Sequence, residues 1–247
     1  MRYFVPILRL SGELPPQSSP QDKLGGLPWG LHASLWPTCR DCGKPQSLLA
    51  QFVHDPVRLD LGRFGRVLNV FQCNHDPGMC STWEGSSGAN ACFVTEPEDL
   101  VAGLAPLPSY SPLVEREARI IEWLERDDGI TEEVAAHFFS LTEFSRMAES
   151  EMAKVTTSTK LGSVPSWIQS PDEAPKDGWR FVGQLDSTYS FLHAPTVSVS
   201  GINEDTEHWE GRSHYCEGPN FGDGGIAYLF LRNTSTVPEG WFFWQCG

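Results

Sequence analysis

The sequence predicts an α+β fold that is mainly antiparallel β, with two β-rich halves and a helical insert between them. Its 247 residues include 19 prolines, 23 glycines and nine tryptophans, a composition typical of many short strands and turns rather than of a helical bundle. Hydrophobic residues make up 40% of the chain, which is enough to bury a substantial core. Segments of the first half also recur, in the same order, in the second half. We therefore divide the chain into residues 1–97, 98–158 and 159–247, packed as one compact unit.

The first half is predicted to consist of strands joined by turns. Residues 1–10 form an apolar run that lacks the length and the cleavage site of a signal sequence, and we expect them to be the first strand. Residues 47–53 have the apolar density of a buried strand, and residues 65–73 alternate between two faces as a strand does. Residues 91–95 are a further short strand, in which Cys92 is expected to belong to the core.

Two cysteine pairs at the ends of these strands predict a metal site. Cys39 and Cys42 are separated by two residues, so a short loop can turn both sulfurs toward one point. Cys73 and Cys80 are further apart, but the Pro77-Gly78 turn between them folds their loop back. The four sulfurs can then surround one structural zinc ion in a tetrahedral arrangement. Buried free thiols and a redox pair are the alternatives.

The number and spacing of the cysteines limit their chemistry. Seven cysteines cannot all form internal disulfides, and the two-residue spacing in a reducing compartment favours metal or redox use. His75 lies inside the second pair and could replace one of its cysteines as a ligand, although a surface-loop histidine is the more ordinary interpretation. Four thiolates leave no open position for water on zinc, which argues against metal catalysis.

A change of period after the proline-rich residues 97–112 predicts the helical insert. Ser111 and Pro112 provide a helix start, and apolar residues at three- and four-residue spacing predict a helix over residues 112–126. A second helical segment is predicted to begin at Thr131 and to carry an apolar face as far as Val155.

The second half resembles the first in sequence. The recurring pieces are 23–29 with 160–167, 49–52 with 181–185, and 65–71 with 225–230. Three pieces in one order predict an internal duplication. The second copy lacks the cysteine pair, so only the first can hold an ion on four cysteines. The apolar residues 241–246 are predicted to be a final core strand.

The charge of the chain bears on its partners. Its formal net charge is −14, from 32 acidic and 18 basic residues, and no basic patch interrupts it, which argues against nucleic acid and anionic lipid as partners. A basic protein partner would fit this charge, although acidity also serves solubility. No apolar run approaches the length that spans a bilayer, so we predict a cytoplasmic protein.

Several motifs taken together resemble known protein families. The motifs are Leu24-Gly-Gly-x-Pro28, Cys39-x-x-Cys42-x-x-Pro45, Leu48-Leu-Ala-Gln51, Val70-Phe-x-Cys73, Trp83 to Asn90 and Phe221 to Phe230. The first four resemble the zinc-binding half of the programmed-cell-death-protein-2 family, and the paired halves resemble the bacterial YwqG-like proteins, a group named as a domain of unknown function. The resemblance implies a duplicated, largely antiparallel β architecture and no catalytic mechanism. It also implies a chaperone that shields a basic ribosomal protein, or an immunity partner of a secreted toxin.

A second candidate site lies in the long excursion between residues 186 and 224. Its acidic and histidine side chains could supply metal ligands or an acid/base pair, although a solvated acidic loop is the more ordinary interpretation. These residues are Asp205, Glu207, His208, Glu210 and His214. The run Gly222-Asp-Gly-Gly225 is predicted to be a tight turn, because no helix follows it and Asp223 would repel a phosphate. No serine elbow or cysteine–histidine spacing indicates a nucleophile.

The sequence thus predicts a non-enzymatic, zinc-stabilised module that binds a basic protein, as a chaperone or as a toxin-immunity protein. The alternatives are an enzyme that uses residues 203–216 and a purely structural subunit.

Overall fold

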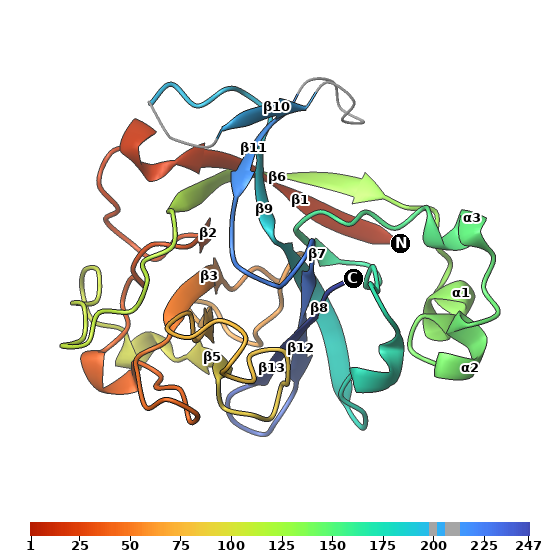
Figure 1. Cartoon of the computed structure of the whole chain (residues 1–247), viewed down its shortest axis with the longest axis horizontal. Helices are drawn as coiled ribbons and strands as arrows, with labels where there is room; N and C mark the ends of the chain where they lie inside the picture. The colour runs from red at the N-terminus through yellow and green to blue at the C-terminus, as the bar shows by residue number, and fades with distance from the viewer. Residues whose placement is uncertain (198–201, 206–212) are drawn as a thin grey trace.

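Ten antiparallel strands close into a barrel (Figure 1). The computed structural model describes residues 1–197, 202–205 and 213–247. The barrel strands are β1 (Arg2–Leu10), β2 (Lys23–Leu24), β3 (Ser47–Val53), β4 (Val67–Gln72), β5 (Asn90–Thr95), β6 (Ala118–Asp127), β7 (Lys160–Gly162), β8 (Trp179–Asp186), β12 (Ile226–Arg232) and β13 (Glu239–Gln245). Their order around the barrel is β1-β6-β2-β3-β4-β5-β13-β12-β8-β7, and β7 pairs again with β1. The predicted strands at 1–10, 47–53, 65–73, 91–95 and 241–246 are confirmed within a few residues.

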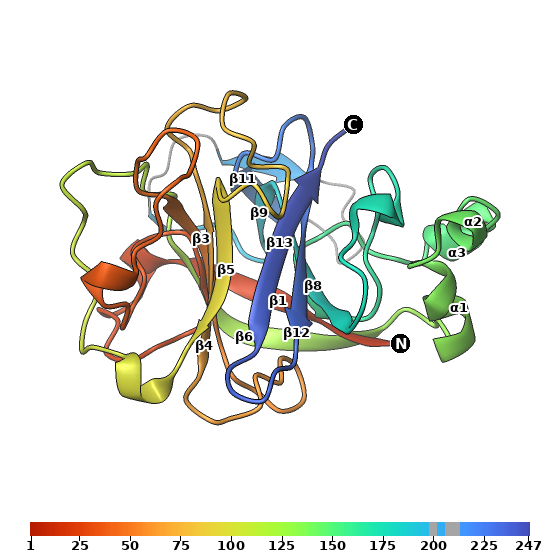
Figure 2. The same ribbon diagram turned by 90° about the horizontal axis from the view of Figure 1, so that it is seen from below.

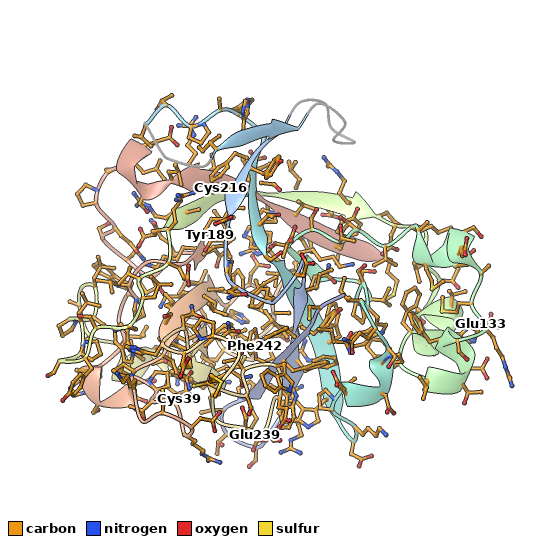
Figure 3. The ribbon with its side chains drawn as sticks, viewed as in Figure 1. Cys39, Glu133, Tyr189, Cys216, Glu239 and Phe242 are labelled. Atoms are coloured by element: carbon orange, nitrogen blue, oxygen red, sulfur yellow. The ribbon has the colours of Figure 1, made fainter. Side chains whose placement is uncertain are left out.

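A small second sheet lies against the barrel. It contains β9 (Thr188–Phe191), β10 (Asn203–Asp205) and β11 (Ser213–Glu217) in the order β10-β11-β9. Tyr189 and Phe191 of β9, together with Cys216 of β11, are buried in the main hydrophobic core that fills the barrel. Figure 3 shows Tyr189 and Cys216 close together on this sheet. The small sheet therefore closes one side of the core.

Three short helices of the predicted insert lie at one side of the barrel (Figure 2). They are α1 (Glu132–His137), α2 (Leu141–Phe144) and α3 (Glu149–Met152). Thr131 caps α1 as predicted, because its hydroxyl accepts a hydrogen bond from the Val134 N–H. Among the described residues the chain also forms four 3₁₀ turns: η1 (Ser11–Glu13), η2 (Ala33–Leu35), η3 (Pro97–Asp99) and η4 (Pro171–Glu173). No helix in residues 1–197, 202–205 and 213–247 is long and apolar enough to cross a membrane.

The helix predicted over residues 112–126 is wrong, because residues 118–127 form β6 and residues 112–117 form neither helix nor strand. In the strand, Ala118 and Ile120 lie two residues apart on the same face, and both contact the main core. Strand β1 requires an antiparallel neighbour along its whole length, and β6 supplies it from Arg2 opposite Asp127 to Leu10 opposite Ala118. Tertiary pairing overrides the local helical pattern.

A second hydrophobic cluster joins the insert to the outside of β12 and β13. Trp167 lies at its centre, with its ring centroid 4.5 Å from that of Tyr228 and 6.2 Å from that of Phe243. The indole N–H of Trp167 donates to the Phe138 carbonyl at 2.6 Å, which fixes α1 against the barrel. The three helices are thus packed on strands of the second half.

The barrel order places the two halves in corresponding positions. From the β1–β6 pair, β2-β3-β4-β5 and β7-β8-β12-β13 run to a common seam between β5 and β13. Lys23 is registered opposite Gln51 in the first half, and Lys160 opposite Gln184 in the second. This arrangement is compatible with the predicted duplication, which stays a prediction. At the seam, the fully described strands β5 and β13 have a single registered pair, Glu239 opposite Phe93.

Candidate metal centre

The four predicted ligands come together at one end of the first half. The sulfurs of Cys39, Cys42, Cys73 and Cys80 all lie within 4.8 Å of one another. Cys39, Cys73 and Cys80 are buried, and Cys42 is partly exposed. The Cys42 and Cys73 sulfurs are 3.6 Å apart. Four sulfurs in this arrangement could bind a metal ion, and sulfur ligands suit soft or borderline ions such as zinc.

The first cysteine pair is shaped by a tight turn before β3. The Cys39 N–H donates to the Lys44 carbonyl and the Gly43 N–H donates to the Cys39 carbonyl, each at 2.8 Å. Gly43 has a φ of 70°, a conformation that favours glycine, so the turn depends on this residue. The Asp41 carboxylate accepts a hydrogen bond from the Ser81 N–H at 2.7 Å and so ties this loop to the second pair.

The second pair is held by a loop that follows β4. The Cys73 N–H donates to the Ala89 carbonyl at 2.8 Å, and the Cys80 N–H donates to the Asp76 carbonyl at 3.2 Å. Gly78, with a φ of 83°, provides the predicted turn between the two cysteines. Backbone hydrogen bonds therefore hold both cysteine loops in place.

The thiols respond differently to their surroundings. Burial raises the pKa of Cys73 to about 11, and burial together with hydrogen bonds from the other sulfurs raises the pKa of Cys80. Burial also acts on Cys42, but the Lys44 N–H and the neighbouring sulfurs outweigh it, so the pKa of Cys42 is lowered. A cation among the sulfurs would favour the thiolate in all four, because a coordinated thiol loses its proton.

The other cysteine and histidine candidates lie outside this group. His75 is partly buried, its Nε2 has no hydrogen-bond partner in the described part of the chain, and it is not one of the clustered ligands. Cys92 packs against the main core, as predicted, and burial raises its pKa to about 12. Gly222 and Gly224 have φ values of 73° and 61° in the bend before β12, which agrees with the predicted turn.

The second predicted site cannot be assembled from the described residues. Glu207, His208 and Glu210 lie outside the residues that the structure describes, and so does the side chain of Asp205. The backbone of Asp205 belongs to β10, and His214 belongs to β11, where it pairs with Phe191.

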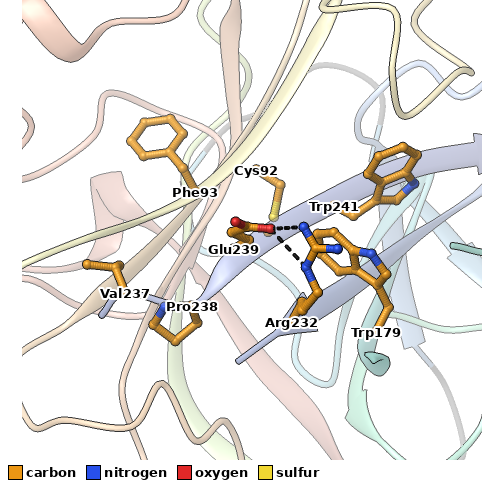
Figure 4. A pocket seen from close by; sticks show the side chains of 9 residues that line it. Cys92, Phe93, Trp179, Arg232, Val237, Pro238, Glu239 and Trp241 are labelled. Atoms are coloured by element: carbon orange, nitrogen blue, oxygen red, sulfur yellow. Dashed lines mark hydrogen bonds and ion pairs between the residues drawn. The ribbon is translucent and has the colours of Figure 1, made fainter. Parts of the chain in front are cut away.

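A shallow groove of about 460 Å³ follows the seam between β5 and β13 (Figure 4). Arg232 forms an ion pair with Glu239 in its wall, and the guanidinium carbon lies 4.7 Å from the centroid of the Trp179 ring. Trp179 in turn contacts Trp241 edge to face, with the centroids 5.6 Å apart. The charges in this groove are thus paired with each other.

Sequence reasoning missed two buried lysines at corresponding positions of the halves. Lys23 and Lys160 are both 0% exposed. The Lys23 ammonium donates to Glu117 at 3.0 Å, to Gln17 at 3.1 Å and to the Leu27 carbonyl. The recurrence of Lys-Leu-Gly at residues 23–25 and 160–162 is the signal that could have identified them.

The Lys160 ammonium, by contrast, has no hydrogen-bond partner among the described residues. It lies 5.5 Å from the centroid of the Tyr3 ring. Burial lowers the pKa of Lys160 to about 7, although the nearby Asp128 carboxylate opposes the shift. The two lysines therefore share a position and differ in how their charge is compensated.

No family model, no curated protein and no solved structure gives a significant match.

Proposed function

We propose that the four cysteines hold one structural zinc ion, and that the chain is a non-enzymatic module that binds a basic protein and shields or neutralises it. The observation that carries the metal part is the convergence of four sulfurs from two loops within 4.8 Å. Three of the four cysteines are buried, which excludes water from the ion and favours a structural site.

A site of this composition supports binding rather than catalysis. Four thiolates fill the tetrahedral coordination of zinc and leave no position for a substrate or an activated water. Zinc would instead stabilise the loops that carry the cysteines, because metal binding is coupled to folding.

The charge of the chain supports a basic partner. The net charge of −14 attracts cationic surfaces over distances comparable to the Debye length and accelerates their association. Part of this charge is exposed on the helical insert, at Glu132, Glu133, Glu143 and Glu149. The motifs that resemble the programmed-cell-death-protein-2 and YwqG-like families support the same two roles, a chaperone for a basic protein or an immunity protein.

The metal part is tested by elemental analysis of protein purified without chelators. We expect one zinc per chain in the wild type, loss of zinc in C42S, and normal zinc content in the control C92S, whose cysteine lies outside the cluster. Thermal unfolding should show a lower midpoint for C42S than for C92S. Protein with its cysteines reduced and no bound zinc would contradict the proposal.

The binding part is tested by affinity capture from the native lysate in a salt series. We expect a basic protein to be retained at low salt and released as the salt concentration rises, because charge drives its association. A chain that retains no basic protein at any salt concentration is not such a module.

A further inference from the structure

Two neighbouring cavities form one cleft beside the metal loop. The larger, of about 310 Å³, is lined by Leu113, Glu115, Arg116, Glu217 and Gly218, among others. The smaller, of about 270 Å³, is lined by Gln72, Thr82 and Trp244, among others. Asn74, Pro77 and Asn220 line both cavities. The cleft thus lies between the loop that follows β4, the segment before β6 and the loop between β11 and β12.

Side-chain amides hold the floor of this cleft in place. The Gln72 amide donates to the Asn220 carbonyl at 2.8 Å and to the Asn74 Oδ1 at 3.1 Å. The Asn74 amide then donates to the Glu115 Oε1 at 2.5 Å. This chain of hydrogen bonds joins loops of both halves, so the cleft does not require a ligand to form.

The cleft has acceptors that no cation of the described residues compensates. Glu115 forms no ion pair there, and burial raises its pKa to about 7, against the hydrogen bond from Asn74. Arg116 lines the same cavity and acts on the Cys216 thiol, whose pKa is raised by burial against the influence of this guanidinium. Gln72 is 2% exposed, and its Oε1 accepts no hydrogen bond from any described residue. The partly buried Glu115 carboxylate and the Gln72 Oε1 would both be stabilised by a hydrogen-bond donor on a ligand, and a positively charged donor would stabilise the carboxylate most.

We infer that the cleft binds an arginine side chain of the basic partner. The inference rests on the proposed function for the identity of the partner, but its geometry is independent of the metal. The guanidinium has five N–H donors in a planar fork, which can serve Glu115, Glu217 and the amide oxygens together. Leu113 is 56% exposed and, with Pro77, offers an apolar wall for the aliphatic stem. The Trp244 indole contributes an aromatic group on which a guanidinium can stack.

The inference is tested with short glycine–serine peptides that carry one arginine, one lysine or one citrulline. Binding to the ¹⁵N-labelled full chain is followed by NMR, through the side-chain amide signals of Asn74 and Asn220. We expect the arginine peptide to shift these signals, the lysine peptide to bind more weakly and the citrulline peptide not to bind. E115Q should weaken the arginine peptide by about tenfold or more, because it removes a desolvated charge partner.

The matched control is E133Q. Glu133 is exposed on the helical insert, at the far side of the molecule from Cys39 (Figure 3), so this variant makes the same charge change away from the cleft. E133Q should bind the arginine peptide as tightly as the wild type. If E115Q and E133Q lose the same affinity for the arginine peptide, the loss would follow from the change in net charge alone, and the inference would be overturned.

The pH dependence gives a second readout. Binding should strengthen from pH 6 to pH 8 in the wild type, as Glu115 loses its proton, and this dependence should vanish in E115Q. The other ionisable groups around the cleft are Arg116, Glu217, Cys73, Tyr189 and Cys216, and E115Q retains all of them. A dependence that persists in E115Q would assign the titration to one of these groups and overturn this part of the inference.

The inference and the proposed function fail in different ways. If the wild type and E115Q capture the same basic protein equally well, the proposed function stands and the arginine cleft is wrong. If the arginine peptide binds at the amides but no basic protein is captured, the cleft stands and the proposed function is wrong. Equal binding of the arginine and lysine peptides would contradict the choice of arginine, and equal binding of the citrulline peptide would contradict charge recognition altogether.

Discussion

Replacing Lys160 with methionine tests how much the buried lysine side chain lowers the free energy of unfolding of the barrel. The Lys160 ammonium is 0% exposed and forms no hydrogen bond with the described residues, and its pKa lies near 7 rather than at the ordinary 10.5. Because the pKa of Lys160 is lower in the folded chain than in the unfolded chain, burial of this amine lowers the free energy of unfolding by a value on the order of 4 kcal/mol at pH 7. Loss of the contact with the Tyr3 ring offsets about 1–2 kcal/mol of the gain. We therefore expect K160M to raise the free energy of unfolding by about 2–3 kcal/mol at pH 7.

The sign of the pH dependence follows from the direction of the shift. The folded pKa lies below the unfolded one, so between about pH 7 and pH 10.5 the unfolded chain binds more protons than the folded chain. In this window Lys160 makes the free energy of unfolding rise with pH, by up to about 1.4 kcal/mol per pH unit. K160M should lose this contribution, and the advantage of the variant should shrink as the pH rises.

The assay is urea unfolding followed by tryptophan fluorescence at pH 7, 8, 9 and 10, with the same zinc concentration throughout. The difference between wild type and K160M cancels the contribution of the cysteines, which both chains share. K23M is the variant matched to K160M, and it removes a buried lysine whose ammonium donates hydrogen bonds to Glu117, Gln17 and the Leu27 carbonyl. K23M should lower the free energy of unfolding by about 2–4 kcal/mol, because Glu117 loses its cation. Parallel pH curves for wild type and K160M, or a less stable K160M, would refute the reasoning.

Three further predictions concern other parts of the barrel. R66M should lower the free energy of unfolding by about 2–4 kcal/mol in urea titrations, since Arg66 donates to Glu96 at 2.6 and 3.0 Å from a largely buried position. G225A should lower the free energy of unfolding by at least about 3 kcal/mol, because a Cβ at Gly225 would lie 1.9 Å from a backbone oxygen. G224A should lower it by only about 1 kcal/mol, because Gly224 has open space around it and only its positive φ disfavours alanine. Equal thermal midpoints for the two variants would contradict this. Addition of a chelator should lower the thermal midpoint of the wild type and leave that of C42S unchanged, as calorimetry can check.

The sequence predicted those parts of the fold that depend on local pattern. The strand at residues 1–10 and the cap at Thr131 follow from apolar spacing and helix-start chemistry, and the structure has both. The four cysteines could be grouped because two cysteine pairs at these spacings, each at a strand end, are typical of metal ligands. In each case the decisive information lies within a few neighbouring residues.

Other features depend on pairing between distant segments. Residues 118–127 form a strand because β1 lies beside them, which their own spacing does not reveal. Glu115 is an ordinary glutamate in a proline-rich connector until the loops after β4 and β11 enclose it. The small sheet could not be anticipated either, because its three short strands gain their stability from the barrel beneath.

The pairing of β1 with β6 has a consequence for how the chain folds. Arg2 must find Asp127, and the barrel closes only when β13 meets β5, so most stabilising contacts join segments far apart in sequence. Folding of such non-local topologies is slow, in the range of milliseconds to seconds. The four cysteines, by contrast, lie within residues 39–80, with β3 and β4 between the two pairs. A metal ion bound by the four sulfurs would therefore link the loop before β3 to the loop after β4 without any ligand from the strands that close the barrel.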